Sequence, residues 1–169
     1  MLHPLIKKAY AVLNGLELPK SLALQLSLLQ GEDILDLVSL AHKVKNKFSP
    51  TYKVCSIMSA KSGACKEDCS YCAQSAYHKS DVEIFALRSP QHILNEAQKV
   101  YKNGVRTFGI VTSGTGYFKI NDPDFQSLLQ SIDLIYSHYP DMEVCLSIGA
   151  LSEETALALL NHKVVHFNT

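Results

Sequence analysis

The sequence predicts an α/β protein with a parallel sheet, either doubly wound or part of a (β/α) barrel. Three observations lead to this class. From residue 52 onward, short apolar runs of strand length alternate with amphipathic helical patterns. Each strand is followed by a helix with short connecting loops, and such repeated βα units imply parallel strands joined by right-handed crossovers. The first fifty residues show helical periodicity alone, so we expect a helical segment over 1–50 and the α/β part over 51–169.

Three helices are expected in the first segment. Residues 3–13 have apolar side chains at near-helical spacing, and Gly15 is a plausible stop. Pro19 suits the first turn of a second helix that runs to Gln30. A third helix opens at Gly31 and should end before Pro50. Its expected apolar stripe consists of Ile34, Leu37, Val38, Ala41 and Val44.

Four strands and three helices follow. The expected strands are residues 52–58, 106–112, 142–148 and 164–167. Between them, helices should begin at Ser89, at Asn121 or Asp122, and at Ser152, because these residue types cap helix N-termini. The side chains expected to face the sheet are Ile93, Leu94, Ala97, Val100 and Tyr101 in the first helix and Phe125, Leu128, Leu129, Ile132 and Ile135 in the second.

Size and charge exclude several classes of function. The chain has 169 residues and equal numbers of basic and acidic side chains, 16 of each, which argues against a nucleic-acid partner. No apolar run approaches the roughly 20 residues that span a bilayer, and the N-terminus lacks the pattern of a secretory signal. We therefore expect a cytoplasmic location and no membrane partner. A (β/α) barrel takes about 250 residues, so four strands suggest a truncated first half with exposed sheet edges.

The cysteines are the most informative residues. Cys65, Cys69 and Cys72 form a C-x3-C-x2-C motif on the polar loop after the first expected strand. Three soft thiolates on one loop suit three corners of a four-iron cluster, and they leave one iron open to the amino and carboxylate groups of a small molecule. A closed zinc site completed by His78 is the alternative.

Other candidate residues have ordinary readings as well as functional ones. Ser113 and Gly114 follow the second expected strand, where backbone amides could approach a cofactor or simply form a turn. Cys55 is expected to be a buried apolar thiol of the first strand. Cys145, between Val144 and Leu146, also has the pattern of core packing.

The cysteine motif, with an aromatic residue before its last Cys, resembles the signature of radical S-adenosylmethionine enzymes. The longer string CSIMSAKSGACKEDCSYCAQSAYHKS closely resembles the corresponding loop of the biotin synthase family. The similarity continues through TFGIVTSG and EVCLSIGALSEE and covers roughly residues 52–168. It implies a partial (β/α) TIM-type barrel of about four βα units, corresponding to the N-terminal half of that family.

The resemblance also implies a chemistry. A [4Fe-4S] cluster on Cys65, Cys69 and Cys72 would bind S-adenosylmethionine, whose adenine meets the backbone of Tyr71. A 5'-deoxyadenosyl radical would then remove hydrogen from dethiobiotin, and an auxiliary cluster, [2Fe-2S] or a variant, would supply the sulfur. Cys145 matches a ligand of that auxiliary cluster. An electron donor such as flavodoxin or ferredoxin, and a homodimer of the full-length protein, are the expected partners.

One departure keeps alternatives open. Gly109 occupies a position where the best-studied members of the family have a Cys ligand of the auxiliary cluster. The auxiliary site is therefore incomplete, through truncation or because the chain belongs to a branch with a different sulfur-donating cluster. The alternatives are another radical S-adenosylmethionine maturase or mutase, or an inactive fragment that binds iron poorly and aggregates.

Overall fold

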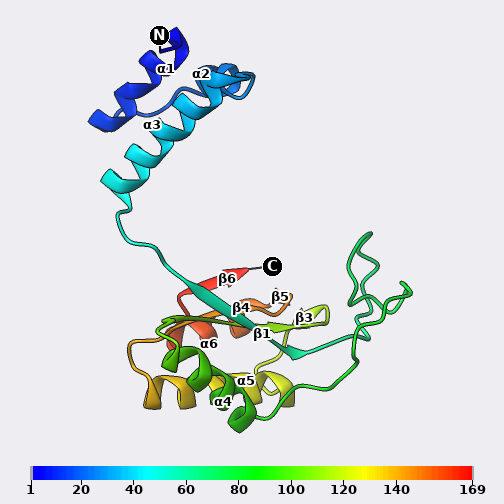
Figure 1. Ribbon diagram of the computed structural model, residues 1–169. Coiled ribbons are helices and arrows are strands. Elements are labelled where there is room, and N and C mark those ends of the chain that lie inside the picture. The colour runs from blue at the N-terminus through cyan, green and yellow to red at the C-terminus, as the bar shows by residue number, and fades with distance from the viewer. Residues whose placement is uncertain (1, 169) are drawn as a thin grey trace. The chain divides into compact units, whose positions relative to one another are not determined.

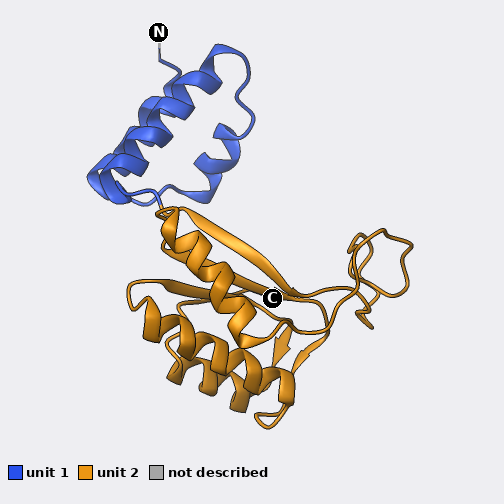
Figure 2. Ribbon diagram, turned by 60° about the horizontal axis from the view of Figure 1, so that its bottom comes forward, with its two compact units in different colours: residues 1–52 blue, residues 53–169 orange. Residues whose placement is uncertain are grey.

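A computed structural model describes residues 2–168. The chain divides into two compact units, residues 1–52 and 53–169 (Figure 2). Each unit has its own apolar core.

The first unit is helical. It contains α1 (Pro4–Ala9), the 3-10 helix η1 (Tyr10–Asn14), α2 (Lys20–Leu26) and α3 (Glu32–Phe48). The single helix expected over residues 3–13 is therefore wrong in detail, since it tightens to 3-10 geometry at Tyr10 before Gly15 ends it with a positive φ of 83°. Pro19 caps α2 instead of occupying its first turn, and that helix ends before Gln30.

The buried face of α3 differs from the predicted stripe. Leu40 is the buried residue of this helix, with Leu37 and Val44 partly buried beside it. These positions follow i, i+3 and i+7 and pack on the core that contains Ile6. The predicted members Ile34, Val38 and Ala41 are exposed, because they lie on the neighbouring stripe of the same helix.

The second unit alternates strands and helices. Its elements are β1 (Cys55–Lys61), α4 (Pro90–Lys102), β2 (Thr107–Thr112), β3 (Gly116–Tyr117), α5 (Pro123–His138), β4 (Glu143–Ser147), β5 (Ala150–Leu151), α6 (Glu153–Asn161) and β6 (His166–Asn168). The main sheet has the order β1-β2-β4-β6 and is parallel throughout.

All three helices of this unit pack on one face of the sheet. Side chains from α4, α5 and α6 share one core with inward residues of β2 and β4, among them Phe108, Ile110, Val144 and Leu146. In Figure 1, α4 and α5 lie side by side along the sheet. Sequential strand order with helices on a single face is the arrangement of a (β/α) barrel, whereas a doubly wound sheet carries helices on both faces. The fold is therefore a partial barrel.

The helix starts confirm the sequence prediction. The side chains of Ser89, Asp122 and Ser152 each accept a hydrogen bond from a backbone amide in the first turn of their helix. The expected apolar faces of α4 and α5 are also confirmed. The first strand, by contrast, lies three residues later than predicted, because its pairing with β2 begins at Cys55 and continues to Lys61.

The short strands β3 and β5 were not predicted. They pair with each other in parallel just beyond the ends of β2 and β4. Gly116 permits this pairing: its φ is +140°, and a Cβ at this position would lie 2.0 Å from the carbonyl oxygen of Ala150. No other residue type fits such an approach.

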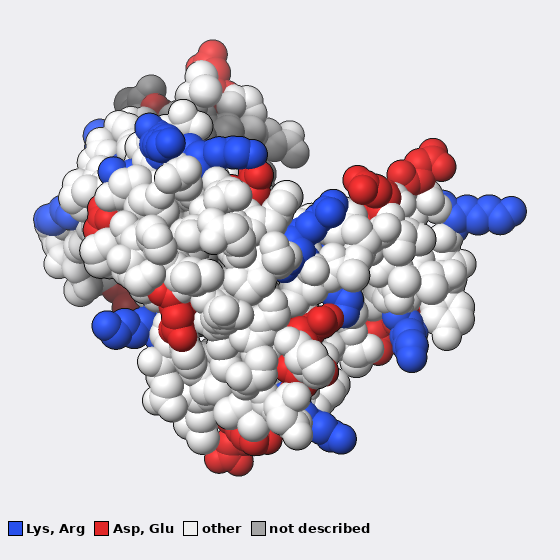
Figure 3. All heavy atoms as spheres, turned by 90° about the horizontal axis from the view of Figure 1, so that it is seen from below, with Lys and Arg blue, Asp and Glu red and all other residues white. Residues whose placement is uncertain are grey.

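Surface features agree with a balanced charge. On the face shown in Figure 3, basic and acidic side chains are interspersed and form no large patch of one sign. Across residues 2–168, no helix combines the length and apolar character needed to cross a membrane.

Candidate functional site

The cysteine loop begins directly after β1, at the carboxyl edge of the sheet. Backbone hydrogen bonds pair Ser62 with Phe85 in both directions, at 3.1 Å each, so the two ends of the loop are fastened together. Inside it, the Cys65 amide donates to the Gln74 carbonyl at 3.0 Å, and the Ala76 amide donates to the Cys65 carbonyl at 2.8 Å. The loop is therefore a closed excursion with a defined backbone.

Gln74 fastens the inner end of this loop. Its side-chain oxygen accepts hydrogen bonds from the Ser62 hydroxyl, at 3.0 Å, and from the Gly63 amide. The hydroxyl of the buried Ser75 donates to the Glu67 carbonyl at 2.6 Å. Sequence reasoning missed these two residues, since nothing in their spacing marks them.

The three motif thiols differ in exposure. Cys65 is buried, Cys72 is half-buried and Cys69 is exposed, although all three lie on the same loop. The structure does not bring their side chains together: within residues 2–168, no three or more Cys, His, Asp or Glu side chains gather as a metal-binding group. His78 directs a ring nitrogen at the Cys69 carbonyl, 2.9 Å away.

The donor chemistry nevertheless fits an iron–sulfur cluster. Thiolates are the ligands that such clusters use, and this loop supplies three of them within eight residues. Cys69 is exposed and Cys72 is partly exposed, so incoming iron and sulfide can reach the loop at Cys69. Backbone hydrogen bonds already close the loop, so cluster binding has less of the backbone left to order.

A cavity of about 360 Å³ lies beside this loop. Its walls come from the end of β1 with the start of the cysteine loop, from residues 84–86, and from the turn that follows β2, which includes Ser113 and Gly114. The Ser113 hydroxyl donates to the Gly63 carbonyl at 2.8 Å, and the Thr115 hydroxyl donates to Glu67 at 2.8 Å. The predicted turn and the cysteine loop are thus joined around one hollow of a size typical of small-molecule sites.

Two further side chains, Tyr71 and Lys61, differ in their relation to this cavity. Tyr71 is 97% exposed and is not among the residues that line the cavity. Lys61 does line it, and its ammonium group contacts the Asp124 carboxylate at 2.8 Å. This hydrogen bond is the main cause of the raised pKa of Lys61, so the cavity wall carries a firmly cationic group. Sequence reasoning did not single out Lys61.

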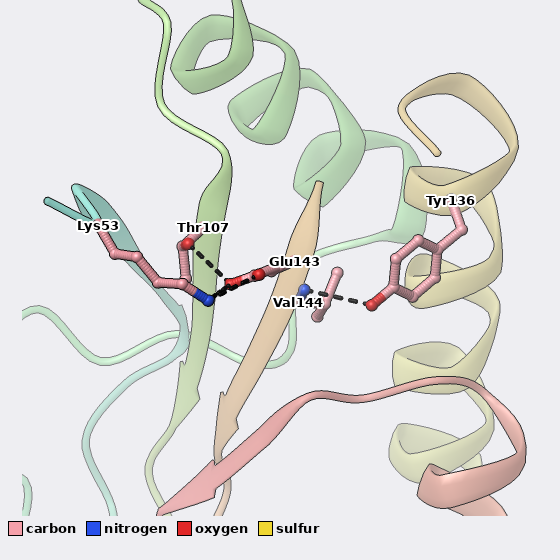
Figure 4. Close-up of polar contacts among 5 residues, drawn as sticks. All are labelled: Lys53, Thr107, Tyr136, Glu143 and Val144. Carbon is pink, nitrogen blue, oxygen red and sulfur yellow. Dashed lines mark hydrogen bonds and ion pairs between the residues drawn. The ribbon is translucent and has the colours of Figure 1, made fainter. Parts of the chain in front are cut away.

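The face of the sheet opposite the helices carries polar side chains and two more thiols. On this face, the Glu143 carboxylate of β4 accepts a hydrogen bond from the Lys53 ammonium group at 2.8 Å and one from the Thr107 hydroxyl at 3.2 Å (Figure 4). On the helical side, the Tyr136 hydroxyl accepts from the Val144 amide (Figure 4). Neighbouring residues of β4 therefore serve opposite faces.

Cys55 and Cys145 both lie on this face. The prediction that Cys55 is a buried thiol is wrong, since it is exposed, and Cys145 is half-buried. Residues that alternate with them, such as Val144 and Leu146, face the core. Burial raises the pKa of Cys145, and the Glu143 carboxylate and the Cys55 thiol raise it further, while Lys53 lowers it.

The chain is similar in sequence to several biotin synthases. No family model matches it. It is 46% identical over 174 residues to the biotin synthase of Pelodictyon phaeoclathratiforme, a match that covers 99% of this chain and 51% of that protein. The biotin synthases of Chlorobium phaeobacteroides strain BS1 and Chlorobaculum parvum are 46% and 44% identical and cover 96% and 99% of this chain.

A solved structure supports the fold. The crystal structure of methylornithine synthase superposes with a TM-score of 0.74 at 16% identity, covering 96% of this chain and 46% of that one. The sequence similarity extends beyond residues 52–168 to the N-terminal helices, further than the motifs alone indicated. The chain spans about half the length of the curated relatives it matches. Over nearly its whole length, the chain is a homologue of the biotin synthases.

Proposed function

We propose that the chain provides the cluster- and cofactor-binding part of a radical S-adenosylmethionine sulfurtransferase that converts dethiobiotin to biotin. One observation carries the proposal. The C-x3-C-x2-C loop leaves the carboxyl end of β1 and shares a cavity with the turn after β2, in a chain 46% identical to a biotin synthase. In (β/α) barrels, this edge of the sheet is where ligands bind.

Cys65, Cys69 and Cys72 are the residues that would hold a [4Fe-4S] cluster. When it is bound together with S-adenosylmethionine, this group supplies an electron and a carbon radical that removes hydrogen from unactivated carbon. The protein's contribution is position. The bonds of Gln74 and Ser75 hold the backbone of the loop at Ser62 and Glu67, so cluster binding has to rearrange only the segment that carries the thiols.

The cavity residues would position the cofactor. Ser113 and Gly114 line the hollow, and Ser113 is held there by its hydroxyl, which donates to the Gly63 carbonyl, and by its amide, which donates to the Lys61 carbonyl. Lys61, whose charge is paired with Asp124, adds an ammonium group whose remaining N–H donors suit a carboxylate. We assign the backbone of Tyr71 to the adenine, on the match of its position to the family's motif; this requires the loop to move, because Tyr71 lies outside the cavity wall.

The open face of the sheet would receive dethiobiotin and the auxiliary cluster, with Cys145 as one ligand. It lies on the side of the sheet away from the helices, which is the barrel interior in this fold. A flavodoxin or ferredoxin as reductant, a homodimer of the complete protein and a cytoplasmic location belong to the same proposal.

The test is anaerobic reconstitution of the chain with ferrous iron and sulfide, followed by reduction and addition of S-adenosylmethionine. We expect 5'-deoxyadenosine to form, and to form faster when dethiobiotin is present. Serine at Cys65, Cys69 or Cys72 should abolish it, whereas Ser70→Ala, a matched change between two ligands, should not. Cleavage indifferent to dethiobiotin would favour a related enzyme with another substrate, and a colourless chain holding one zinc ion would contradict the proposal.

A further inference from the structure

Two thiols on the open face have no role in the cysteine loop. In β1, Cys55, Ile57 and Ser59 are exposed and Ala60 is buried, so Cys55 points away from the helices. In β4, the alternation places Cys145 on that same side, with Val144 and Leu146 buried on the other. The chain therefore presents two thiols, from two different strands, to one surface.

The strand between them offers no donor at the level of Cys145. Gly109 of β2 pairs with Ile57 on one side and with Cys145 on the other. A Cβ at Gly109 would lie 2.6 Å from Cγ2 of Ile57, so the isoleucine side chain already occupies the space that a cysteine there would need. Glycine has no thiol, and the Ile57 side chain occupies the space that a side chain at position 109 would need.

Cys55 lies within reach of the same region. It pairs with Thr107, which pairs with Glu143, and Cys145 follows Glu143 by two residues. Two strand spacings and two residues of rise put the two Cα atoms roughly 12 Å apart. This separation is too wide for one metal ion and suits an assembly of several irons bridged by sulfide.

We propose that Cys55 and Cys145 together bind an iron–sulfur group on the open face, with Cys55 supplying the thiolate that Gly109 does not. The inference rests on the proposed function, since it concerns the auxiliary cluster of the same enzyme. It differs from the pattern the resemblance implied, because that pattern places the donor on β2 and this structure places it on β1.

The experiment isolates this site by removing the first. In a chain with Cys65→Ser, Cys69→Ser and Cys72→Ser, the remaining thiols are Cys55 and Cys145. After anaerobic reconstitution with ferrous iron and sulfide and desalting, we expect at least about two irons per chain with visible thiolate-to-iron absorption. Adding Cys55→Ser or Cys145→Ser should lower the retained iron about two-fold or more.

Ser59→Ala in the same parent is the matched control, because Ser59 is an exposed residue of the same strand and face; its iron content should not change. Circular dichroism and melting temperature identify any variant that has not folded. A parent that retains no iron above a chain lacking all five cysteines would overturn the proposal. So would a folded Cys55→Ser variant with undiminished iron.

The reciprocal chain separates this proposal from the proposed function. Cys55→Ser with Cys145→Ser keeps the three loop cysteines, and its iron and S-adenosylmethionine response report on the loop alone. We expect this reciprocal chain to bind iron on the loop and to respond to S-adenosylmethionine as the parent does. In the chain without the loop cysteines, we expect Cys55→Ser or Cys145→Ser to lower the retained iron.

Discussion

The two faces of the main sheet, built from the same strands, have opposite chemistry. Toward the helices, Ile110, Val144 and Leu146 are almost fully buried in one continuous apolar core. Toward the other side, the alternating positions carry Cys55, Glu143 and Cys145. One face therefore stabilises the fold and the other is available for chemistry, which is how a (β/α) barrel supports both tasks.

The largest expected effect comes from truncating one residue type on each face. Ile110→Ala should cost about 2–5 kcal/mol of the free energy of unfolding, because Ile110 is 0% exposed and its removal leaves a cavity. Ile57→Ala, on the paired strand, should cost less than about 1 kcal/mol, because Ile57 is 71% exposed. Urea denaturation of both variants measures the difference, and equal losses would show that the open face is also part of the core.

A smaller effect is expected in the cysteine loop, where hydrogen bonds and few apolar contacts maintain the structure. Gln74→Ala removes an acceptor shared by Ser62 and Gly63, so protection of the Gly63 amide from hydrogen exchange should fall about ten-fold, corresponding to about 1.4 kcal/mol. Gln91→Ala removes an exposed bond within α4 and is the matched control. Unchanged protection in Gln74→Ala would mean that other contacts close the loop.

The smallest effect on stability is expected at the amino-terminal end of the strands, in the segment that leads into β4. Asp141 accepts from the Tyr101 hydroxyl at 2.8 Å and from Arg106 at 3.0 Å, and these contacts lower its pKa below the ordinary 3.8. A lowered carboxyl pKa stabilises the fold above the ordinary value and loses that effect as pH falls through the lowered one. Asp141→Asn should therefore melt slightly lower than the parent at neutral pH and equally at strongly acidic pH. A difference that persists in acid would rule out the charge as its cause.

Local signals account for what the sequence predicted well. Ser89, Asp122 and Ser152 cap their helices through contacts within one turn. The C-x3-C-x2-C spacing, together with the resemblance, singled out Cys65, Cys69 and Cys72, whose role as cluster ligands stays a prediction. The start of β1 was misplaced because strand limits depend on the partner strand. β3 and β5 were missed because two-residue strands exist only through each other. The exposure of Cys55 and the role of Gln74 depend on contacts from distant segments, which no local pattern contains.

Electron paramagnetic resonance of the reconstituted, reduced chain tests the central claim most directly, with S-adenosylmethionine absent and then present. The account predicts a reduced iron–sulfur signal that depends on Cys65, Cys69 and Cys72 and changes shape when S-adenosylmethionine is added, because the cofactor binds the open iron. A signal that S-adenosylmethionine leaves unchanged, or that survives the loss of those three thiols, would contradict it.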